Sequence, residues 1–492
     1  MQRRILVAAL TAVAANTLAN EQPLEHVLVS VPLHKTEAET ALPVTVLSGD
    51  ELKRLATTSI GDTLRDQPGI ANASFGPGVG RPVLRGQAGP RTVTLQNGTA
   101  SADVSSLSPD HAVGVEPFLA ESVEVLRGPA TLLYGGGAIG GVVNVIDNRI
   151  PRSVPDTLSG GAEYRHDTAT GLDSLTGVLE GGTGNFAFHL SANTLESDDV
   201  EIPGNALRFP EEEEDEHEGE GAERGEIPNT DTEAGSATLG VSWHLGDSGF
   251  VGLAVNHQER EYGVPPGAHG HHEQEQDEGH EDEHGEEEET IRIDLEQTRY
   301  DTQLHLHDIG GGVEVLRGFL SYTDYEHREL EGAETGTVYD RETFEGRLEV
   351  VHKPIADAHG VVGLQWREDE FEAIGDEAYV PPTESSELGL FIVEDIHVGD
   401  WLLEVGLRGD WVDRDPEGAL DSADFTSVSV SGAGLWSVHD NWQLGVSVSR
   451  SERAPSTEEL FSNAGLDDPE EFVTHAATGL IEIGDSDLDE EV

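Results

Sequence analysis

Short segments with alternating apolar and polar side chains, spread between residues 157 and 450, constrain the fold of this chain more than any other feature. The clearest lies at 401–411, where Trp401 and Val405 share one face and Glu404 lies on the other. A period of two residues is typical of a β-strand with one apolar face. Tryptophans at both ends of this segment fit a strand that crosses a membrane. A strand of a soluble sandwich has the same period, so alternation alone leaves both folds open.

The connections between these segments favour a membrane barrel. After the first hairpin the gaps alternate between short ones, such as 246–248, and long ones, such as 195–234 and 261–290, which is typical of bacterial outer-membrane barrels. Beyond the N-terminus there is no run of about twenty apolar residues, so a membrane form of this chain must be a barrel. We predict thirteen strands, near 159–166, 172–181, 185–194, 235–245, 249–260, 291–306, 313–327, 337–352, 359–371, 387–397, 401–413, 426–438 and 441–450.

The N-terminus predicts export. Gln2, Arg3 and Arg4 precede the apolar run 5–15, and the small residues that follow supply a cleavage site. This order is typical of a secretory signal peptide, which we place at residues 1–19. Residues 20–41 then form a polar leader that contains one short extended apolar segment.

Composition limits the partners. The chain has 28 Lys and Arg against 96 Asp and Glu, a formal net charge of −68, which excludes nucleic acid and favours cations. It has no Cys and one Met, which disfavours cuprous copper because that ion prefers sulfur ligands. We find no G-x-S-x-G motif, and we do not expect an enzyme.

Two kinds of candidate metal ligand stand out. Asp110 and His111 are adjacent in a loop rich in Ser and Pro, where neither helix nor strand forces them to opposite faces. The long gap 261–290 carries five histidines among carboxylates. Imidazole with carboxylate suits zinc, nickel or cupric copper. A solvated acidic tract is the alternative for this gap, but histidines add nothing to solubility, so we favour loose metal capture. The five histidines are His269, His271, His272, His280 and His284.

A glycine-rich stretch at 123–146, VEVLRGPATLLYGGGAIGGVVNVI, has β-rich arms around residues suited to tight turns. This sequence resembles the plug domain of TonB-dependent outer-membrane receptors, and the upstream segment RPVLRGQAGPRTVTLQNG extends the resemblance. The resemblance implies a mainly β fold: an N-terminal α+β plug domain at 42–150 inside a transmembrane antiparallel β-barrel at 151–492. It places the chain in the bacterial outer membrane, with lipid around it and the gaps 195–234 and 261–290 as outer loops.

Other segments are similar to the zinc-uptake branch of this family, namely SPDHA, EYGVPPGAHGHH, IRIDLEQTRYDTQL and THAATGLIEIGDSDLDEE. This similarity implies a zinc site made by Asp110, His111, His475 and Glu334, with Glu331 and Glu377 as alternatives to Glu334. Such a mixed shell of nitrogen and oxygen ligands suits zinc. The family also implies that the TonB energy-coupling complex pulls on a TonB box in the leader, here Val27, Leu28, Val29, Ser30 and Val31.

Strand number departs from the family pattern. Receptors of this kind close roughly 22 strands, whereas this sequence accounts for thirteen or fourteen. We therefore expect an incomplete, open barrel from a truncated product or a fragment. The expected function is outer-membrane uptake of zinc. Haem, a siderophore or another metal chelate is the alternative cargo for the same fold, and a passive calcium-binding surface adhesin is the alternative from another class.

Overall fold

The computed structural model describes residues 30, 44–135, 138–205, 224–265, 290–332, 334–375, 378–439, 442–466, 468, 471–475 and 480–492. The predicted signal peptide, the leader apart from Ser30, and the five loop histidines lie outside these residues. Among the described residues no helix is both long and apolar enough to cross a membrane.

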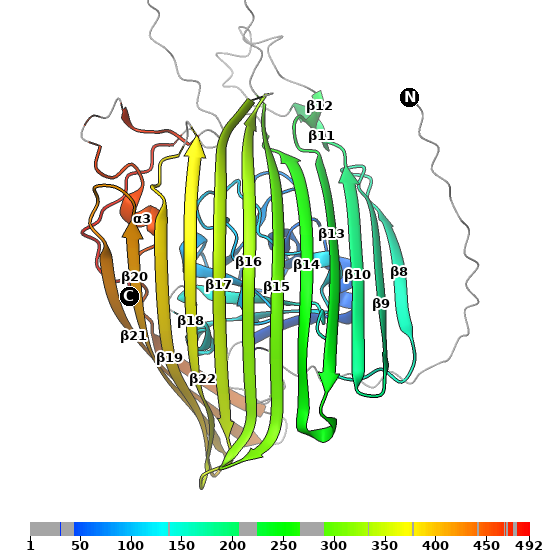
Figure 1. Ribbon diagram of the computed structural model, residues 1–492, viewed down its shortest axis with the longest axis vertical. Coiled ribbons are helices and arrows are strands. Elements are labelled where there is room, and N and C mark those ends of the chain that lie inside the picture. Colours follow the sequence, from blue (N-terminus) through cyan, green and yellow to red (C-terminus); the bar gives the residue numbers. More distant parts are fainter. Residues whose placement is uncertain are drawn as a thin grey trace, which may run out of the picture.

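Thirteen antiparallel strands form one strongly curved sheet in which every strand pairs with its neighbours in sequence order (Figure 1). All thirteen predicted strands are confirmed, and several of the long ones extend further than predicted at the end of the sheet where Gly263 and Ile291 lie. Among the described residues β8 and β22 are the two edges of the sheet, as expected for an open barrel. The strands are β8 (Ser159–His166), β9 (Asp173–Thr183), β10 (Phe186–Ser197), β13 (Thr232–His244), β14 (Gly249–Gly263), β15 (Ile291–Gly310), β16 (Val313–Glu331), β17 (Glu334–His352), β18 (Ala358–Gly375), β19 (Thr383–Val398), β20 (Trp401–Pro416), β21 (Ala423–His439) and β22 (Trp442–Arg450).

One hairpin inside a predicted long loop was not predicted. It consists of β11 (Val200–Asn205) and β12 (Arg224–Ile227), which pair with each other apart from the large sheet. Pro203 and Gly204 within β11 predict a turn rather than a strand, because proline lacks an N–H and glycine weakens a strand.

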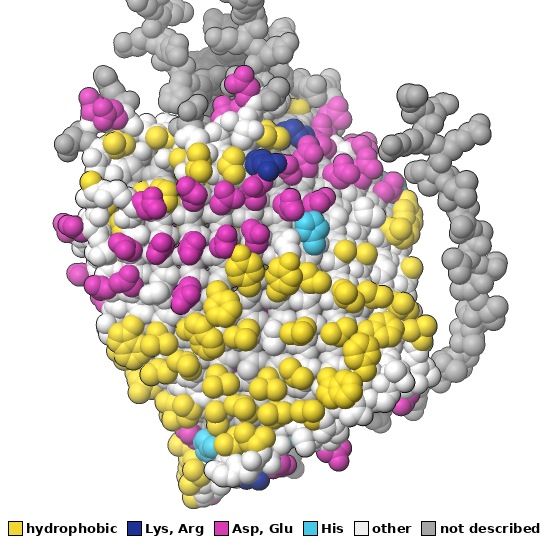
Figure 2. All heavy atoms as spheres, viewed as in Figure 1, with side chains coloured by type: hydrophobic (Ala, Val, Ile, Leu, Met, Phe, Trp, Pro, Cys, Tyr) yellow, Lys and Arg dark blue, Asp and Glu magenta, His cyan; other side chains and the backbone are white. Residues whose placement is uncertain are grey.

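The two faces of the large sheet differ as the alternation predicts. On β20, Glu404 and Arg408 are buried on the concave face, whereas Val405 and Trp411 are exposed on the convex face. Figure 2 shows that apolar side chains form a continuous band across the convex face. A band of this kind next to polar regions fits the hydrocarbon layer of a membrane.

Rows of carboxylates lie on the same convex face, beside the apolar band and nearer the end of the sheet at which Gly263 and Ile291 lie (Figure 2). Within a row each carboxylate lies directly opposite the next one on the neighbouring strand. Like charges in such positions repel each other. Three rows of five follow from the strand register: Asp173, Glu196, Glu233, Glu261 and Asp294; Glu259, Glu296, Glu326, Asp340 and Glu372; and Asp324, Glu342, Glu370, Glu384 and Asp415.

The N-terminal part of the chain folds into a small α+β unit. Its central sheet has the order β1-β6-β7-β4-β5, with β4 and β7 parallel, and a second hairpin pairs β2 with β3. The glycine-rich stretch supplies β6, a 3-10 helix and β7, so both of its arms are fully paired strands. The elements are β1 (Val44–Ser48), α1 (Gly49–Leu55), α2 (Ile60–Leu64), β2 (Ile70–Ser74), β3 (Gly80–Leu84), β4 (Thr92–Gln96), β5 (Thr99–Ala100), β6 (Ser122–Leu126), the 3-10 helix Gly128–Tyr134 and β7 (Gly141–Ile146).

This unit lies inside the curvature of the large sheet (Figure 1). Buried apolar side chains of both parts share one core, and guanidinium groups of the sheet donate to backbone carbonyls of the inner unit. Arg299 donates to the Ala100 carbonyl at 2.6 Å, and Arg347 donates to the Leu133 carbonyl at 2.6 Å. Each arginine is also paired with a carboxylate two residues further along its own strand. The inner unit therefore has the position of a plug.

Candidate metal centre

The first two residues of the centre come from a plug loop. Asp110 and His111 lie between β5 and the 3-10 helix Pro117–Leu119, and both are buried. The hydroxyl of Tyr262 on β14 donates to the Asp110 carbonyl at 3.0 Å and accepts the Ala112 N–H at 3.0 Å. The Ser108 hydroxyl donates to the Asp110 carboxylate. The loop is thus fixed both by its own side chains and by the barrel wall.

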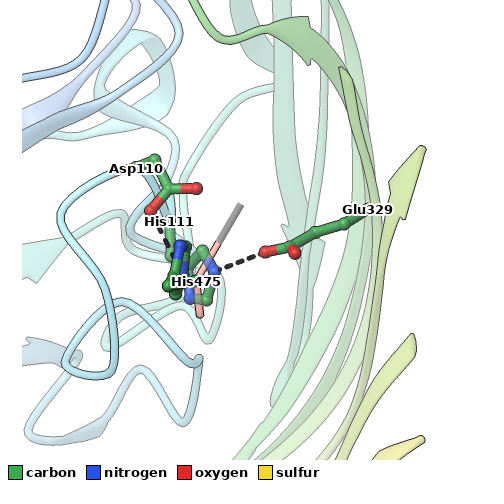
Figure 3. A group of neighbouring side chains, drawn as sticks. All are labelled: Asp110, His111, Glu329 and His475. Carbon is green, nitrogen blue, oxygen red and sulfur yellow. Dashed lines mark hydrogen bonds and ion pairs between the residues drawn. The ribbon is translucent and has the colours of Figure 1, made fainter. Parts of the chain in front are cut away.

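The third residue comes from the barrel wall. Glu329 is two residues from the end of β16, and its side chain points into the lumen because residues 325, 327 and 329 alternate onto the buried face. Figure 3 shows its carboxylate directed from the strand toward the plug loop.

The fourth residue, His475, comes from the segment that follows β22 and the short helix α3 (Thr457–Phe461). Asn463 holds this segment with its side chain, which accepts the Val473 N–H at 2.8 Å and donates to the Glu482 carbonyl at 2.8 Å. Arg453 and the plug residue Arg91 both pair with Glu491, at 2.6 Å and 2.7 Å. The C-terminal segment is therefore bound to the plug, and it places His475 beside Asp110.

The four side chains converge on one point (Figure 3). One ligand atom from each of Asp110, His111, Glu329 and His475 lies within 4.8 Å of all the others. His111 Nε2 is 2.9 Å from Glu329 Oε1, and His475 Nε2 is 3.8 Å from Asp110 Oδ1. All four are fully buried or nearly so. The arrangement offers two imidazoles and two carboxylates to a single ion.

The hydrogen bonds around His111 show that the centre suits a cation. Its Nδ1 is 3.1 Å from the Val104 carbonyl, which can only accept, so Nδ1 carries a proton and donates it. In the neutral imidazole Nε2 then has a lone pair, and it faces a carboxylate oxygen that is also an acceptor. Two acceptors at this distance need a cation between them, either a proton or a metal ion. A ligand histidine whose other nitrogen donates to a backbone carbonyl is the usual arrangement at metal sites.

The electrostatics point in the same direction. Burial lowers the pKa of His111, but the negative charges of Asp110 and Glu329 outweigh burial and leave this pKa above its ordinary value. Asp110 Oδ2 and both ring nitrogens of His475 are buried without a hydrogen bond. Buried polar atoms without partners are costly, and a bound cation would satisfy them.

The structure brings three of the four expected ligands together, namely Asp110, His111 and His475. Glu334 is exposed at the start of β17 and lies outside the cluster, and Glu329 lies in the cluster instead. Of the alternatives, Glu331 pairs with Glu334 at the end of the hairpin and is not in the cluster either, and Glu377 lies outside the described residues. The period of two along β16 could have indicated Glu329, because it shares a face with Tyr325 and the buried strand interior.

Comparisons with known proteins agree with this architecture. The family description "TonB-dependent Receptor Plug Domain" matches residues 36–142, and "TonB dependent receptor-like, beta-barrel" matches residues 221–492. The chain therefore belongs to the TonB-dependent receptors. These are outer-membrane proteins of Gram-negative bacteria and not enzymes, so the predicted fold class and location are confirmed.

Curated relatives match over part of their length. A hemin receptor of Yersinia pestis is 27% identical over 188 residues, which cover 35% of this chain and 27% of that protein. The ferric enterobactin receptor PirA of Pseudomonas aeruginosa is 29% identical over 191 residues, covering 34% and 25%. The vitamin B12 transporter BtuB of Photobacterium profundum is 26% identical over 252 residues, covering 50% and 36%. The match thus spans between 25% and 36% of the length of these three relatives.

Solved structures show the same fold. The copper transporter OprC superposes with a TM-score of 0.68 at 17% identity, covering 86% of this chain and 67% of that one. The FrpB iron transporter of Neisseria meningitidis superposes with a TM-score of 0.64 at 15% identity, covering 84% and 65%. At these identities the likeness concerns the fold alone.

Proposed function

We propose that this protein takes up a bare divalent metal ion, with zinc as the first choice, across the outer membrane in a TonB-coupled step. The observation that carries the proposal is the convergence of four buried ligand side chains within 4.8 Å. Two imidazoles and two carboxylates suit zinc, and also nickel or cupric copper. A sulfur ligand is missing from the set, which disfavours cuprous copper.

The size and chemistry of the centre argue against the other cargoes. The relatives are named as receptors for hemin, ferric enterobactin and vitamin B12, all of which are large molecules. Ligand atoms that converge on one point in a fully buried place suit a single ion. Calcium takes six to eight oxygen ligands, so a set containing His111 and His475 disfavours a calcium-binding adhesin.

The origin of the ligands suggests how the ion is released. Asp110 and His111 belong to the plug, Glu329 to the barrel wall, and His475 to the C-terminal segment. A movement of the plug relative to the wall would separate the first two ligands from the others and break the shell. The histidines of the gap 261–290 would gather ions ahead of this centre.

Energy for this movement has to come from a partner, which in this family is the TonB complex. Of the proposed TonB box only Ser30 is among the described residues, and it is buried against the plug core. Its N–H donates to Glu124 at 2.8 Å, its carbonyl accepts from the Tyr134 hydroxyl at 2.7 Å, and its hydroxyl accepts from Asn144 at 2.8 Å. Force applied near Ser30 would therefore act directly on β6 and β7.

Metal titration of the purified protein in detergent tests the proposal. The five loop histidines are first replaced by asparagine, which isolates the buried centre from loop capture. We expect this background to bind one zinc ion per chain and to lose it when Asp110→Asn and His475→Ala are combined. Calcium and haem should not compete. Zinc binding that survives the double substitution, or haem binding that depends on these residues, would refute the proposal.

A further inference from the structure

We propose that His327 is a fifth ligand of the metal centre, so that the captured ion is held by three imidazoles and two carboxylates. The inference rests on the proposed function, since it adds a residue to the same centre. His327 lies on β16 two residues before Glu329 and shares its lumen-facing side. It is fully buried, and the centre of its ring is 4.4 Å from the centre of the His111 ring, with the two rings edge to face.

The two nitrogens of His327 have different surroundings. Nδ1 is 3.1 Å from the Tyr325 hydroxyl, whose oxygen can accept a hydrogen bond from it in the tautomer that leaves the lone pair on Nε2. Nε2 has no hydrogen bond and lies 3.6 Å from Glu329 Oε1. An anchored Nδ1 and a free Nε2 directed at a ligand carboxylate is the arrangement that a metal-binding histidine needs.

The distances fit an ion better than they fit hydrogen bonds. Two donors that are each about 2.1 Å from zinc lie about 3.0 Å apart at a right angle and about 3.4 Å apart at a tetrahedral angle. Glu329 Oε1 is 2.9 Å from His111 Nε2 and 3.6 Å from His327 Nε2. At 3.6 Å the second contact is too long for a hydrogen bond, yet it has the length of an edge between two ligands of one ion. The first distance matches the right angle found in shells of five or six ligands.

The alternative to a ligand role for His327 is a purely structural one. Its ring also packs 5.2 Å from the ring of Tyr339, so it fills space in the core between plug and wall. Phenylalanine would keep this packing and remove both nitrogens, which makes His327→Phe the informative substitution. A ligand role and a packing role then give opposite results.

The experiment compares variants in the background that lacks the loop histidines. We expect His327→Phe to weaken zinc binding at least about 10-fold to 100-fold, because loss of a group that only supports a metal ligand already has an effect of this size. Bound Co²⁺ gives a second readout, because its visible bands are less intense in five-coordinate sites than in four-coordinate ones. The bands should therefore be weak in the parent protein and gain intensity in His327→Phe.

His189→Phe is the matched control, because His189 is also buried, lies 2.9 Å from a glutamate, Glu180, and belongs to β10, which β13, β14 and β15 separate from β16. It should change neither readout. If His327→Phe does not fold, Tyr325→Phe removes the anchor of Nδ1 and should weaken zinc binding by a smaller factor. Zinc affinity and cobalt bands that stay unchanged in His327→Phe would overturn the inference and leave the four-residue centre intact. A parent protein that binds no metal would refute the proposed function itself.

Discussion

Replacing Glu329 by glutamine separates metal binding from folding at this centre. The carboxylate faces the lone pair of His111 Nε2 at 2.9 Å, a contact that is favourable only with a cation in between. The amide of glutamine can donate a hydrogen bond to the same lone pair, so the metal-free protein should keep its stability. The amide carries no charge, however, and its nitrogen cannot bind an ion. Metal binding should therefore fall while the fold remains.

The size of the effect follows from linkage. We expect Glu329→Gln to weaken zinc binding by about 100-fold, the upper end of the losses found for groups that support a metal. At a free zinc concentration of about 1,000 times the parent Kd, zinc stabilises the parent protein by about 4.1 kcal/mol. At the same concentration it would stabilise the variant by only about 1.4 kcal/mol. This difference is large compared with the expected change in the metal-free protein.

Two measurements check the prediction: zinc titration against a competing chelator, and thermal unfolding in detergent with and without zinc. Glu334→Gln is the control, because Glu334 is exposed three residues beyond the end of β16, and this variant should bind zinc like the parent. If Glu329→Gln binds zinc as tightly as the parent, Glu329 is not a ligand. If the metal-free variant is strongly destabilised, the account of the His111 contact is wrong.

Three further predictions concern the surroundings of the centre. Tyr262→Phe removes both hydrogen bonds between the barrel wall at Tyr262 and the plug loop, so we expect about 10-fold weaker zinc binding and a loss of about 1–3 kcal/mol in stability, measured by titration and unfolding. Although burial opposes it, neighbouring guanidinium groups hold the pKa values of Glu459 and Glu491 below the ordinary 4.5. The stability that these two carboxylates contribute to the folded protein is thus complete above about pH 4.5 and is lost as the pH falls through the lowered pKa values. Hydrogen exchange of residues 453–492 should detect this loss. Combining Glu459→Gln with Glu491→Gln should abolish the pH dependence. Raising NaCl from about 0.1 M to 1 M shortens the screening length from about 10 Å to 3 Å, so the unfolding temperature should rise, and Glu326→Gln with Asp340→Asn should reduce the rise.

The strands could be predicted from the sequence because their period of two is a local property. Each strand pairs with the next one along the chain, so no distant contact decides the topology of the large sheet. The plug was recognisable from its glycine-rich sequence rather than from the periodicity of its apolar residues. The hairpin β11–β12 was missed because Pro203 and Gly204 have the composition of a turn, and only pairing with a distant segment makes that stretch extended.

The centre was harder to predict because its ligands are brought together from segments far apart in sequence. Asp110 and His111 are adjacent, and adjacency in a loop is visible in a sequence. The choice between Glu329 and Glu334 depends on where the hairpin between β16 and β17 turns. An error of a few residues in that turn moves a carboxylate from the lumen to the exposed rim, which is what happened with Glu334. The position of His475 depends on contacts of Asn463 and Arg453 that no local pattern reveals.

The carboxylate rows on the convex face also set how deeply the protein sits in the membrane. The apolar band ends where the rows begin (Figure 2). If the protein moved along the membrane normal so that one row entered the hydrocarbon layer, its ionised carboxylates would be buried there. The free-energy cost of that burial grows with depth. The rows would therefore hold the protein at one height in the bilayer. Glu329 of the candidate metal centre, two residues from the end of β16, would then lie on the water side of the rows.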